Sequence, residues 1–403
     1  MKLVVFSHKP CWPCAVSPTG FATDGGFPFQ LAAIAELFDE TVLLVPCGRR
    51  PDGEGEIPLA GPSLRVSALP APSGSGLGRK LLLALWLFRC APAILGEFRG
   101  AGAIHAAIPG DVGTVGMLLA WIFRKPLFVR HCGNWLRPVT LAEKFWRWFM
   151  VKFAGGRNIM LATGGAAESP SRKNPKVRWI FSSSLTQKEL RVYANPRTFP
   201  TRGQLRLIIV ARQEKAKGAA TAIQSLPLLA QKFPQESLDI VGEGAAIPEF
   251  RQLARDIGVA GRVDFTGKLT HEQVMQRLQK ADLFIFPTTA SDGFPKAVLE
   301  ALASGLPVVS TRVSVLPQLI GAGCGVLIDE ATPEAVARGI ERAISNPTQY
   351  EAMSRNAIET ARRYSLENWR DTIGGYLEAA WGPLKAEVGG QKPEVRFQQA
   401  VVP

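Results

Sequence analysis

Two carboxylates, Asp292 and Glu300, follow a short apolar run near the C-terminal end of the sequence. The run at residues 283–286 is long enough for one buried parallel strand, and apolar residues recur at helical spacing over 297–302. This pattern predicts a strand–loop–helix turn with Asp292 at its lip and Glu300 inside the helix. In an open α/β sheet such turns lie at the carboxyl ends of the strands, where ligands bind. Carboxylates there can accept hydrogen bonds from hydroxyl groups, and the first N–H groups of the helix suit an anion, so the turn suits a sugar nucleotide.

Two cations, Arg212 and Lys217, follow another apolar run at residues 205–210. Cations that flank a strand–helix turn suit a diphosphate, because its negative charge builds up as an attached sugar leaves. An Arg and a Lys in a loop are more often solvated surface residues. Their position on the first strand–helix turn of a domain favours the binding role.

The elements that must position these side chains are strands and helices in alternation, which favours an α/β fold. A strand at residues 2–7 is followed by a loop that ends in Gly25 and Gly26 before a helix, and His131 lies just past a strand at 126–130. Gly242 follows a strand at 238–241, and Lys268 with Leu269 ends a strand that begins at 263. A lone Gly-Gly is as often a flexible turn, and an arbitrary His is more often structural. Near the C-terminal end, three helices are expected near 333–345, 348–363 and 366–381.

The stretch from Asp292 to Val308 closely resembles the signature of the retaining family 4 glycosyltransferases of GT-B fold. That signature has an acidic residue, Gly-Phe, a seven-residue gap, Glu-Ala, Gly and Pro-Val, and it stands here as Asp292-Gly293-Phe294-Pro295, Glu300-Ala301, Gly305 and Pro307-Val308. There are two departures, since the family usually has Glu where Asp292 stands and Gly where Pro295 stands. Pro295 removes one N–H group that could face a phosphate.

This resemblance implies a GT-B fold, in which two Rossmann-like domains face each other across a cleft. It implies an acceptor-side domain at 1–199, a nucleotide-sugar-binding domain at 200–365, and a C-terminal segment at 366–403 whose helix crosses back to the first domain before a tail. Residues 194–204, rich in Pro, are the expected linker.

The resemblance also assigns roles within the proposed site. Arg212 and Lys217 would clamp the diphosphate, while His131 and Asp292 would hold the sugar. The remaining donor-binding residues would be Gly25, Gly26, Gly242, Lys268, Leu269, Gly293, Phe294, Lys296, Ala297 and Glu300. We expect a retaining, metal-independent hexosyltransferase with no cofactor, because Arg and Lys can do the work of a metal.

The net charge of +13 indicates anionic partners. Residues 137–157 carry Trp and Phe among Lys and Arg, a composition typical of a membrane interface, although an amphipathic core helix is the alternative. A second apolar helix at 80–98 fits the core better than an interface. We therefore expect a glycan or lipid-linked acceptor and peripheral contact with an anionic membrane through 137–157. No nucleic-acid-binding motif is present.

The start of the sequence has no long apolar region, and no apolar run is long enough to span a membrane, so the protein is expected to be cytoplasmic, on the inner face of the membrane where it attaches. The six cysteines are scattered and are expected to be reduced. Cys11 and Cys14 have the spacing of a redox pair, but they lie deep in a long loop rather than at a helix start, which favours a structural role.

Two other functions remain open. A sugar-nucleotide epimerase of GT-B fold would need an acid/base pair but no acceptor. A catalytically weak subunit would bind sugar nucleotide and turn nothing over, which the Asp292 and Pro295 departures would suit.

Overall fold

The computed structural model describes residues 1–403 except 51–55, 73–75, 167, 201–203, 292 and 387–403. The chain divides into two compact units. Unit 1 is formed by the described parts of Met1–Thr163, Ala167–Ile180 and Leu366–Pro403, and unit 2 by Gly164–Ala166 and the described parts of Phe181–Ser365. Residues 181–199, expected in the first domain, therefore fall in unit 2, where Leu185 and Leu190 join the hydrophobic core. The expected tail at 387–403 lies outside the described residues.

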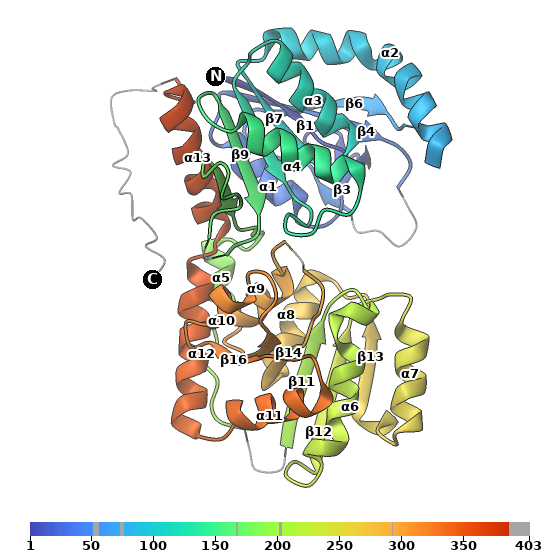
Figure 1. Ribbon diagram of the computed structural model, residues 1–403, viewed down its shortest axis with the longest axis vertical. Coiled ribbons are helices and arrows are strands. Elements are labelled where there is room, and N and C mark those ends of the chain that lie inside the picture. The colour runs from blue at the N-terminus through green and yellow to red at the C-terminus, as the bar shows by residue number, and fades with distance from the viewer. Residues whose placement is uncertain (51–55, 73–75, 167, 201–203, 292, 387–403) are drawn as a thin grey trace. The chain divides into compact units, whose positions relative to one another are not determined.

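Unit 1 is built on a parallel seven-stranded sheet (Figure 1). In spatial order its strands are β10 (Val177–Ile180), β9 (Asn158–Thr163), β8 (Leu127–His131), β7 (Ala103–Ile108), β1 (Lys2–Phe6), β4 (Glu40–Cys47) and β6 (Leu64–Pro70). β7 and β8 are buried along their whole length, so their polar side chains His105 and Arg130 find partners inside the unit, the carbonyl of Phe128 and the side chain of Gln30. A small antiparallel sheet joins β2 (Trp12–Pro13), β3 (Phe21–Thr23) and β5 (Ile57–Pro58).

Helices cover the large sheet of unit 1. Three of them share one core cluster with the strands, namely α2 (Gly76–Gly100), α3 (Asp111–Ile122) and α4 (Leu141–Phe153). The last described helix, α13 (Leu366–Trp381), packs against α1 (Phe27–Ala35), so the end of the chain completes the unit in which the chain began.

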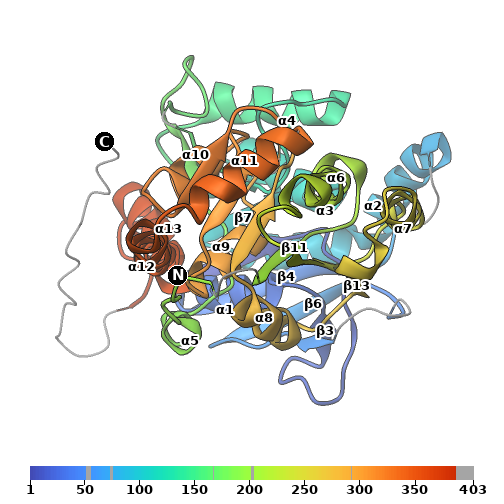
Figure 2. The same ribbon diagram turned by 90° about the horizontal axis from the view of Figure 1, so that it is seen from below.

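Unit 2 is built on a parallel six-stranded sheet. In spatial order its strands are β13 (Val263–Gly267), β12 (Gln235–Val241), β11 (Gln204–Val210), β14 (Leu283–Phe286), β15 (Val308–Thr311) and β16 (Gly325–Ile328). One core cluster contains α6 (Ala219–Leu229), α7 (Ile247–Asp256) and α11 (Pro333–Ala343). A second contains α5 (Gln187–Tyr193), α8 (His271–Lys280), α9 (Lys296–Ala303), α10 (Leu316–Ile320) and α12 (Pro347–Arg362). Figure 2 shows α6 and α8 on opposite sides of β11. Two short 3₁₀ helices, η1 (Lys215–Lys217) and η2 (Ala260–Arg262), lie in the connections.

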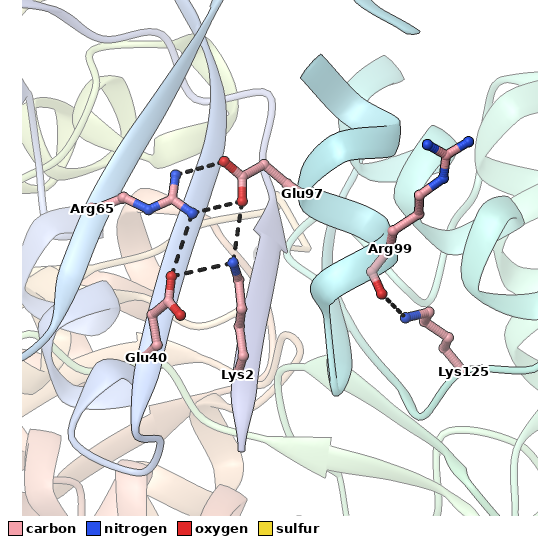
Figure 3. Close-up of polar contacts among 6 residues, drawn as sticks. All are labelled: Lys2, Glu40, Arg65, Glu97, Arg99 and Lys125. Carbon is pink, nitrogen blue, oxygen red and sulfur yellow. Dashed lines mark hydrogen bonds and ion pairs between the residues drawn. The ribbon is translucent and has the colours of Figure 1, made fainter. Parts of the chain in front are cut away.

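An ion-pair network joins the amino ends of three strands of unit 1 to the end of α2 (Figure 3). Glu97 of α2 accepts two hydrogen bonds from Arg65, at 2.6 and 2.7 Å, and lies 3.3 Å from the Nζ of Lys2. Glu40 lies 3.2 Å from the same Nζ and 3.4 Å from Arg65. The hydrogen bonds from Arg65 hold the pKa of Glu97 below its ordinary value of 4.5.

Replacing Glu97 with Gln should weaken the fold by about 1 kcal/mol at pH 7, since these groups are partly exposed. Because the folded-state pKa of Glu97 is lowered, its ionised form stabilises the protein above pH 4.5, and that contribution is lost as the pH falls through the lowered pKa. The difference between wild type and Glu97→Gln in urea midpoint should therefore shrink on acidification. Glu359→Gln, which removes an exposed pair with Arg362 inside one helix, is the control and should change little. A difference in urea midpoint between wild type and Glu97→Gln that stays constant with pH would contradict the prediction.

Cys11 lies beside Cys47, the last residue of β4. Cys11 and Cys47 form an isolated parallel bridge, and burial raises the pKa of Cys11 to about 12. Cys14 belongs to a small apolar cluster with Trp12 and Ala22. All six thiols are free. None of the helices that can be described is both long enough and apolar enough to cross a bilayer.

Candidate active site

The carboxyl ends of four neighbouring strands of unit 2 carry most of the residues that the sequence assigns to donor binding. The loops that follow β11, β12, β13 and β14 are tied together by backbone hydrogen bonds. Gln213 N–H donates to Glu243 O at 2.8 Å, Gly242 N–H to Gly267 O at 2.8 Å, and Thr289 N–H to Ala216 O at 2.9 Å. The loops therefore form one continuous edge rather than four independent turns.

Arg212 and Lys217 both lie on the loop after β11, in different environments. The Arg212 side chain is 77% exposed, and its Nη1 lies 3.1 Å from Oε1 of Glu214. Lys217 is the last residue of η1 and is only 5% exposed. Lys217 is thus the fixed cation of this loop, and Arg212 is the one that can swing towards a ligand.

Two glycines allow the close approach of these loops. Gly218 has φ +88°, and a Cβ there would stand 2.5 Å from the carbonyl oxygen of Pro287. Gly242 has φ +117°, and a Cβ would stand 2.0 Å from the carbonyl oxygen of Ala211. Both the backbone conformation and the space exclude a side chain at either position.

The start of α9 follows the loop after β14. Pro295 is its N-cap residue and gives no side-chain cap, so the N–H groups of Lys296 and Ala297 precede the first bonds of the helix. The N–H of Val298 donates to the Pro295 carbonyl at 3.1 Å. Gly293 lies at the lip of the loop. Asp292 lies outside the described residues.

Phe294 is a core residue by its side chain. It is 9% exposed, and its ring lies 6.2 Å from that of Phe181 and 5.6 Å from that of Tyr364. Leu269 and Ala297 are also partly buried against this cluster. Only the backbone of Phe294 remains for contact with a donor.

Glu300 lies in the second turn of α9, with its side chain 15% exposed. Its Oε1 lies 3.5 Å from Nδ1 of His271, the first residue of α8. The contact with Glu300 raises the pKa of His271 above its ordinary value of 6.5. The ring of Tyr193 meets His271 edge-on at 6.2 Å. His271 was not expected here, and its adjacency to Glu300 depends on the pairing of α8 with α9, which no motif encodes.

In unit 1, His131 ends β8 and is 2% exposed. Its ring packs edge-on against Trp135 at 5.5 Å, and a Cβ on Gly133 would approach it to 3.3 Å. Its Nδ1 has no hydrogen-bond partner among the described residues, and burial lowers the pKa of His131 to about 4. The imidazole is therefore neutral at pH 7. β1 belongs to the same sheet as β8. The connection from β1 to α1 ends in Gly25, with φ +69°, and Gly26, which is the N-cap of α1.

Two arginines, one buried and one half-buried, were missed by the sequence reasoning. Arg130 of β8 is 5% exposed, donates to the side chain of Gln30 at 2.8 Å, and lies over the ring of Trp369 at 5.1 Å. Arg197 donates to the carbonyls of Leu278, Gln279 and Ser304. Both stand on segments with no motif, and their partners are far away in the sequence. Among the residues that can be described, no three of His, Cys, Asp or Glu form a group able to hold a metal ion.

Comparison with known proteins gives a consistent result. Residues 197–360 match the family model of glycosyl transferases group 1. A D-inositol 3-phosphate glycosyltransferase of Corynebacterium urealyticum is 30% identical over 40% of this chain and 39% of its own length. A GDP-mannose-dependent alpha-(1-6)-phosphatidylinositol monomannoside mannosyltransferase of Mycobacterium tuberculosis is 24% identical over 77% of this chain and 79% of its own length.

Among solved structures, HepE of Anabaena in complex with UDP superposes with a TM-score of 0.66 at 18% identity, over 94% of this chain and 100% of that one. WaaG, a glycosyltransferase involved in lipopolysaccharide biosynthesis, gives 0.56 at 16% identity, over 94% and 99%. The first curated relatives are matched over 37 to 44% of their length. Residues 197–360 are therefore similar to the glycosyl transferases group 1 family, and the chain has the GT-B fold of two Rossmann-like domains.

Proposed function

We propose that this protein is a retaining glycosyltransferase that moves a sugar from a nucleotide-diphosphate donor to a hydroxyl group of a lipid-linked or envelope glycan. The observation that carries the proposal is the joined edge of unit 2, where Arg212 and Lys217 follow β11 while Lys296 and Glu300 stand on the helix after β14. Cations and a carboxylate on adjacent loops suit a diphosphate joined to a ribose.

In this mechanism the bond between the sugar and the diphosphate breaks as negative charge collects on the leaving group. Lys217 and Arg212 neutralise that charge, and the N–H groups of Lys296 and Ala297 add donors. Glu300 accepts hydrogen bonds from the ribose hydroxyl groups. No protein nucleophile is assigned, so retention follows from attack of the acceptor hydroxyl on the face that the diphosphate leaves.

The remaining roles concern the sugar and the ends of the donor. Asp292 and the neutral His131 hold sugar hydroxyl groups, since a neutral imidazole can both donate and accept a hydrogen bond. The backbones of Gly25, Gly26, Gly242, Gly293 and Phe294, together with Lys268 and Leu269, complete donor binding. Charge neutralisation by Arg212 and Lys217 makes the activity metal-independent in this proposal.

A lipid-linked acceptor is supported by two observations. The mycobacterial relative is named for a phosphatidylinositol monomannoside acceptor. In unit 1, α4 buries Trp146, Phe149 and Met150 and leaves Trp148 54% exposed, so the segment 137–157 offers an aromatic and basic surface for peripheral contact with an anionic membrane.

The proposal is tested by measuring binding and slow hydrolysis of a panel of UDP-, GDP- and ADP-sugars by the purified chain, with EDTA present. Tight binding of one donor with release of free nucleotide supports a metal-free transferase. Conversion of the donor to an isomeric sugar nucleotide without acceptor would instead favour an epimerase. Binding without any turnover, even with acceptor extracts, would favour a binding subunit.

Replacing Glu300 with Gln should raise the dissociation constant for the donor by about tenfold, because hydrogen bonds to a charged acceptor contribute about 1.5 kcal/mol or more each. The substitution keeps the size of the side chain and removes only its charge. Titration calorimetry with nucleoside diphosphate gives the measurement. Glu272→Gln, next to His271 on α8, is the matched control and should bind as wild type does. Equal affinity of Glu300→Gln and wild type would remove Glu300 from the site.

A further inference from the structure

Exposed apolar side chains are concentrated on one helical layer of unit 1. Of the fifteen large apolar residues found exposed in the described part of the chain, eleven lie between Leu82 and Trp148. They fall on α2, on the end of α3, and on α4 with the loop before it. These three helices share one core cluster and therefore cover the same face of the sheet.

The segment that forms this layer also carries most of the net positive charge of the sequence, although one of its cations, Arg130, is buried on β8. Between residues 76 and 157 the sequence has twelve Lys or Arg and three Asp or Glu, a difference of nine out of the total of +13. The three acids have partners, since Glu97 lies in the ion-pair network, Glu143 closes the capping box of α4, and Asp111 in the first turn of α3 is also engaged. An exposed apolar layer with this charge fits an anionic surface.

Within the layer, α2 is apolar on two sides. Trp86, Cys90, Ile94 and Phe98 recur every four residues and are buried in the core of unit 1. Leu82 stands four residues before Trp86 and continues this series, but it is 43% exposed. On the other side of the helix Leu85 and Phe88 are 65% and 81% exposed. The helix has no charged residue between Arg89 and Glu97.

Figure 1 shows α2 along one side of unit 1, with its N-terminal end reaching past the edge strand β6. The prediction that this helix belongs to the core is therefore correct for only one of its sides. One side of α2 is core, and the other is covered by nothing in the described chain.

We propose that the exposed side of α2, defined by Leu85 and Phe88, inserts into the interface of an anionic lipid bilayer, and that the cations of α4 in the same helical layer contact its head groups. Apolar residues alone would also fit a second copy of the chain. A symmetric contact between two such layers, however, would bring like charges together, which opposes self-association. A lipid surface accepts the apolar side chains and neutralises the cations at the same time. This inference adds α2 to the proposed membrane contact through 137–157. It rests on the proposed function only in that a lipid-linked acceptor would explain why the protein binds a membrane.

The test is flotation of the full chain with phosphatidylcholine vesicles that contain or lack phosphatidylglycerol. We expect binding only with phosphatidylglycerol, and we expect Leu85→Glu with Phe88→Glu to lower the bound fraction by about tenfold or more, because each substitution puts a charge where an apolar side chain inserts. The matched control is Val16→Glu with Val192→Glu, two residues that are 83% and 67% exposed but lie outside the layer. The control should float as wild type does.

Equal flotation of Leu85→Glu/Phe88→Glu and wild type would overturn the proposal, as would equal binding to vesicles without phosphatidylglycerol. Concentration-dependent dimerisation of the wild type that the α2 double variant abolishes would also overturn it, in favour of a second copy. Unfolding midpoints of both variants report whether they fold. Flotation needs no sugar transfer, so a chain that floats as expected but hydrolyses no donor would refute the proposed function and leave this inference standing.

Discussion

Replacing Lys217 with Ala should lower kcat for sugar transfer by about a hundredfold or more, the usual loss when one fixed group that stabilises transition-state charge is removed. The residue is 5% exposed, and its N–H donates to Glu214 O at 2.9 Å. It also precedes Gly218, whose backbone is pressed against Pro287. Its ammonium group therefore needs little reorganisation when charge develops on the diphosphate.

The same reasoning predicts an order of effects. Arg212→Ala should cost less than Lys217→Ala, because the Arg212 side chain is exposed and must leave Glu214 before it can serve the leaving group. Lys215, in the same 3₁₀ helix, lies 2.7 Å from Glu249 with a side chain that is 75% exposed, so Lys215→Ala is the matched control and should retain activity. Steady-state kinetics with saturating donor gives kcat for each variant. A Lys217→Ala enzyme with wild-type kcat would rule out the diphosphate clamp.

Replacing Arg197 with Met should lower the stability of unit 2 by about 3 kcal/mol. Arg197 precedes β11, and its guanidinium donates to the carbonyls of Leu278 and Gln279 at the end of α8 and of Ser304 just after α9. The carbonyl of Leu278 also accepts from the N–H of Ala281 at 3.3 Å, so Met would take the guanidinium donor away chiefly from the carbonyls of Gln279 and Ser304. Burial lowers the pKa of Arg197, and several acceptors on two helices offset that cost.

The measurement is the urea midpoint of the full chain followed by far-UV circular dichroism. Arg197→Lys should recover only part of the loss, because one ammonium group cannot reach carbonyls on two helices as the planar guanidinium does. Arg157→Met is the matched control, since Arg157 donates to a single carbonyl, that of Arg124, at an exposed place in unit 1. If Arg197→Met unfolded together with wild type, the guanidinium would have no part in joining α8 to α9.

Much of unit 2 could be predicted from its sequence. The predicted helices at 333–345 and 348–363 appear as α11 and α12, because each begins at a Thr or Asn cap followed by Pro and continues with apolar residues at helical spacing. The turns that carry Arg212, Gly242 and Glu300 also follow their strands as expected. Local signals suffice for such elements.

What could not be predicted depends on contacts between distant residues. Phe294 has a signature position, but only the packing of Phe181 and Tyr364 around it shows that its ring faces the core. The assignment of 181–199 to unit 2 depends on Leu185, Leu190 and Arg197 finding partners about a hundred residues away. The sequence could not predict that α2 is exposed on one side, because Leu85 and Trp86 are both apolar. Only the fold shows that Leu85 is exposed while Trp86 is buried.

The network around Glu97 has a mechanical consequence for α2. The C-terminal end of this helix is fixed to the first residue of β1 through Lys2 and to β6 through Arg65, while Phe98 is buried beside it. Because Trp86, Cys90 and Ile94 are also buried in the core, α2 cannot rotate independently of the sheet. If the N-terminal part of α2 inserts into the lipid, unit 1 should therefore adopt one fixed orientation on the bilayer. Neutron reflectometry would then show a single narrow protein layer.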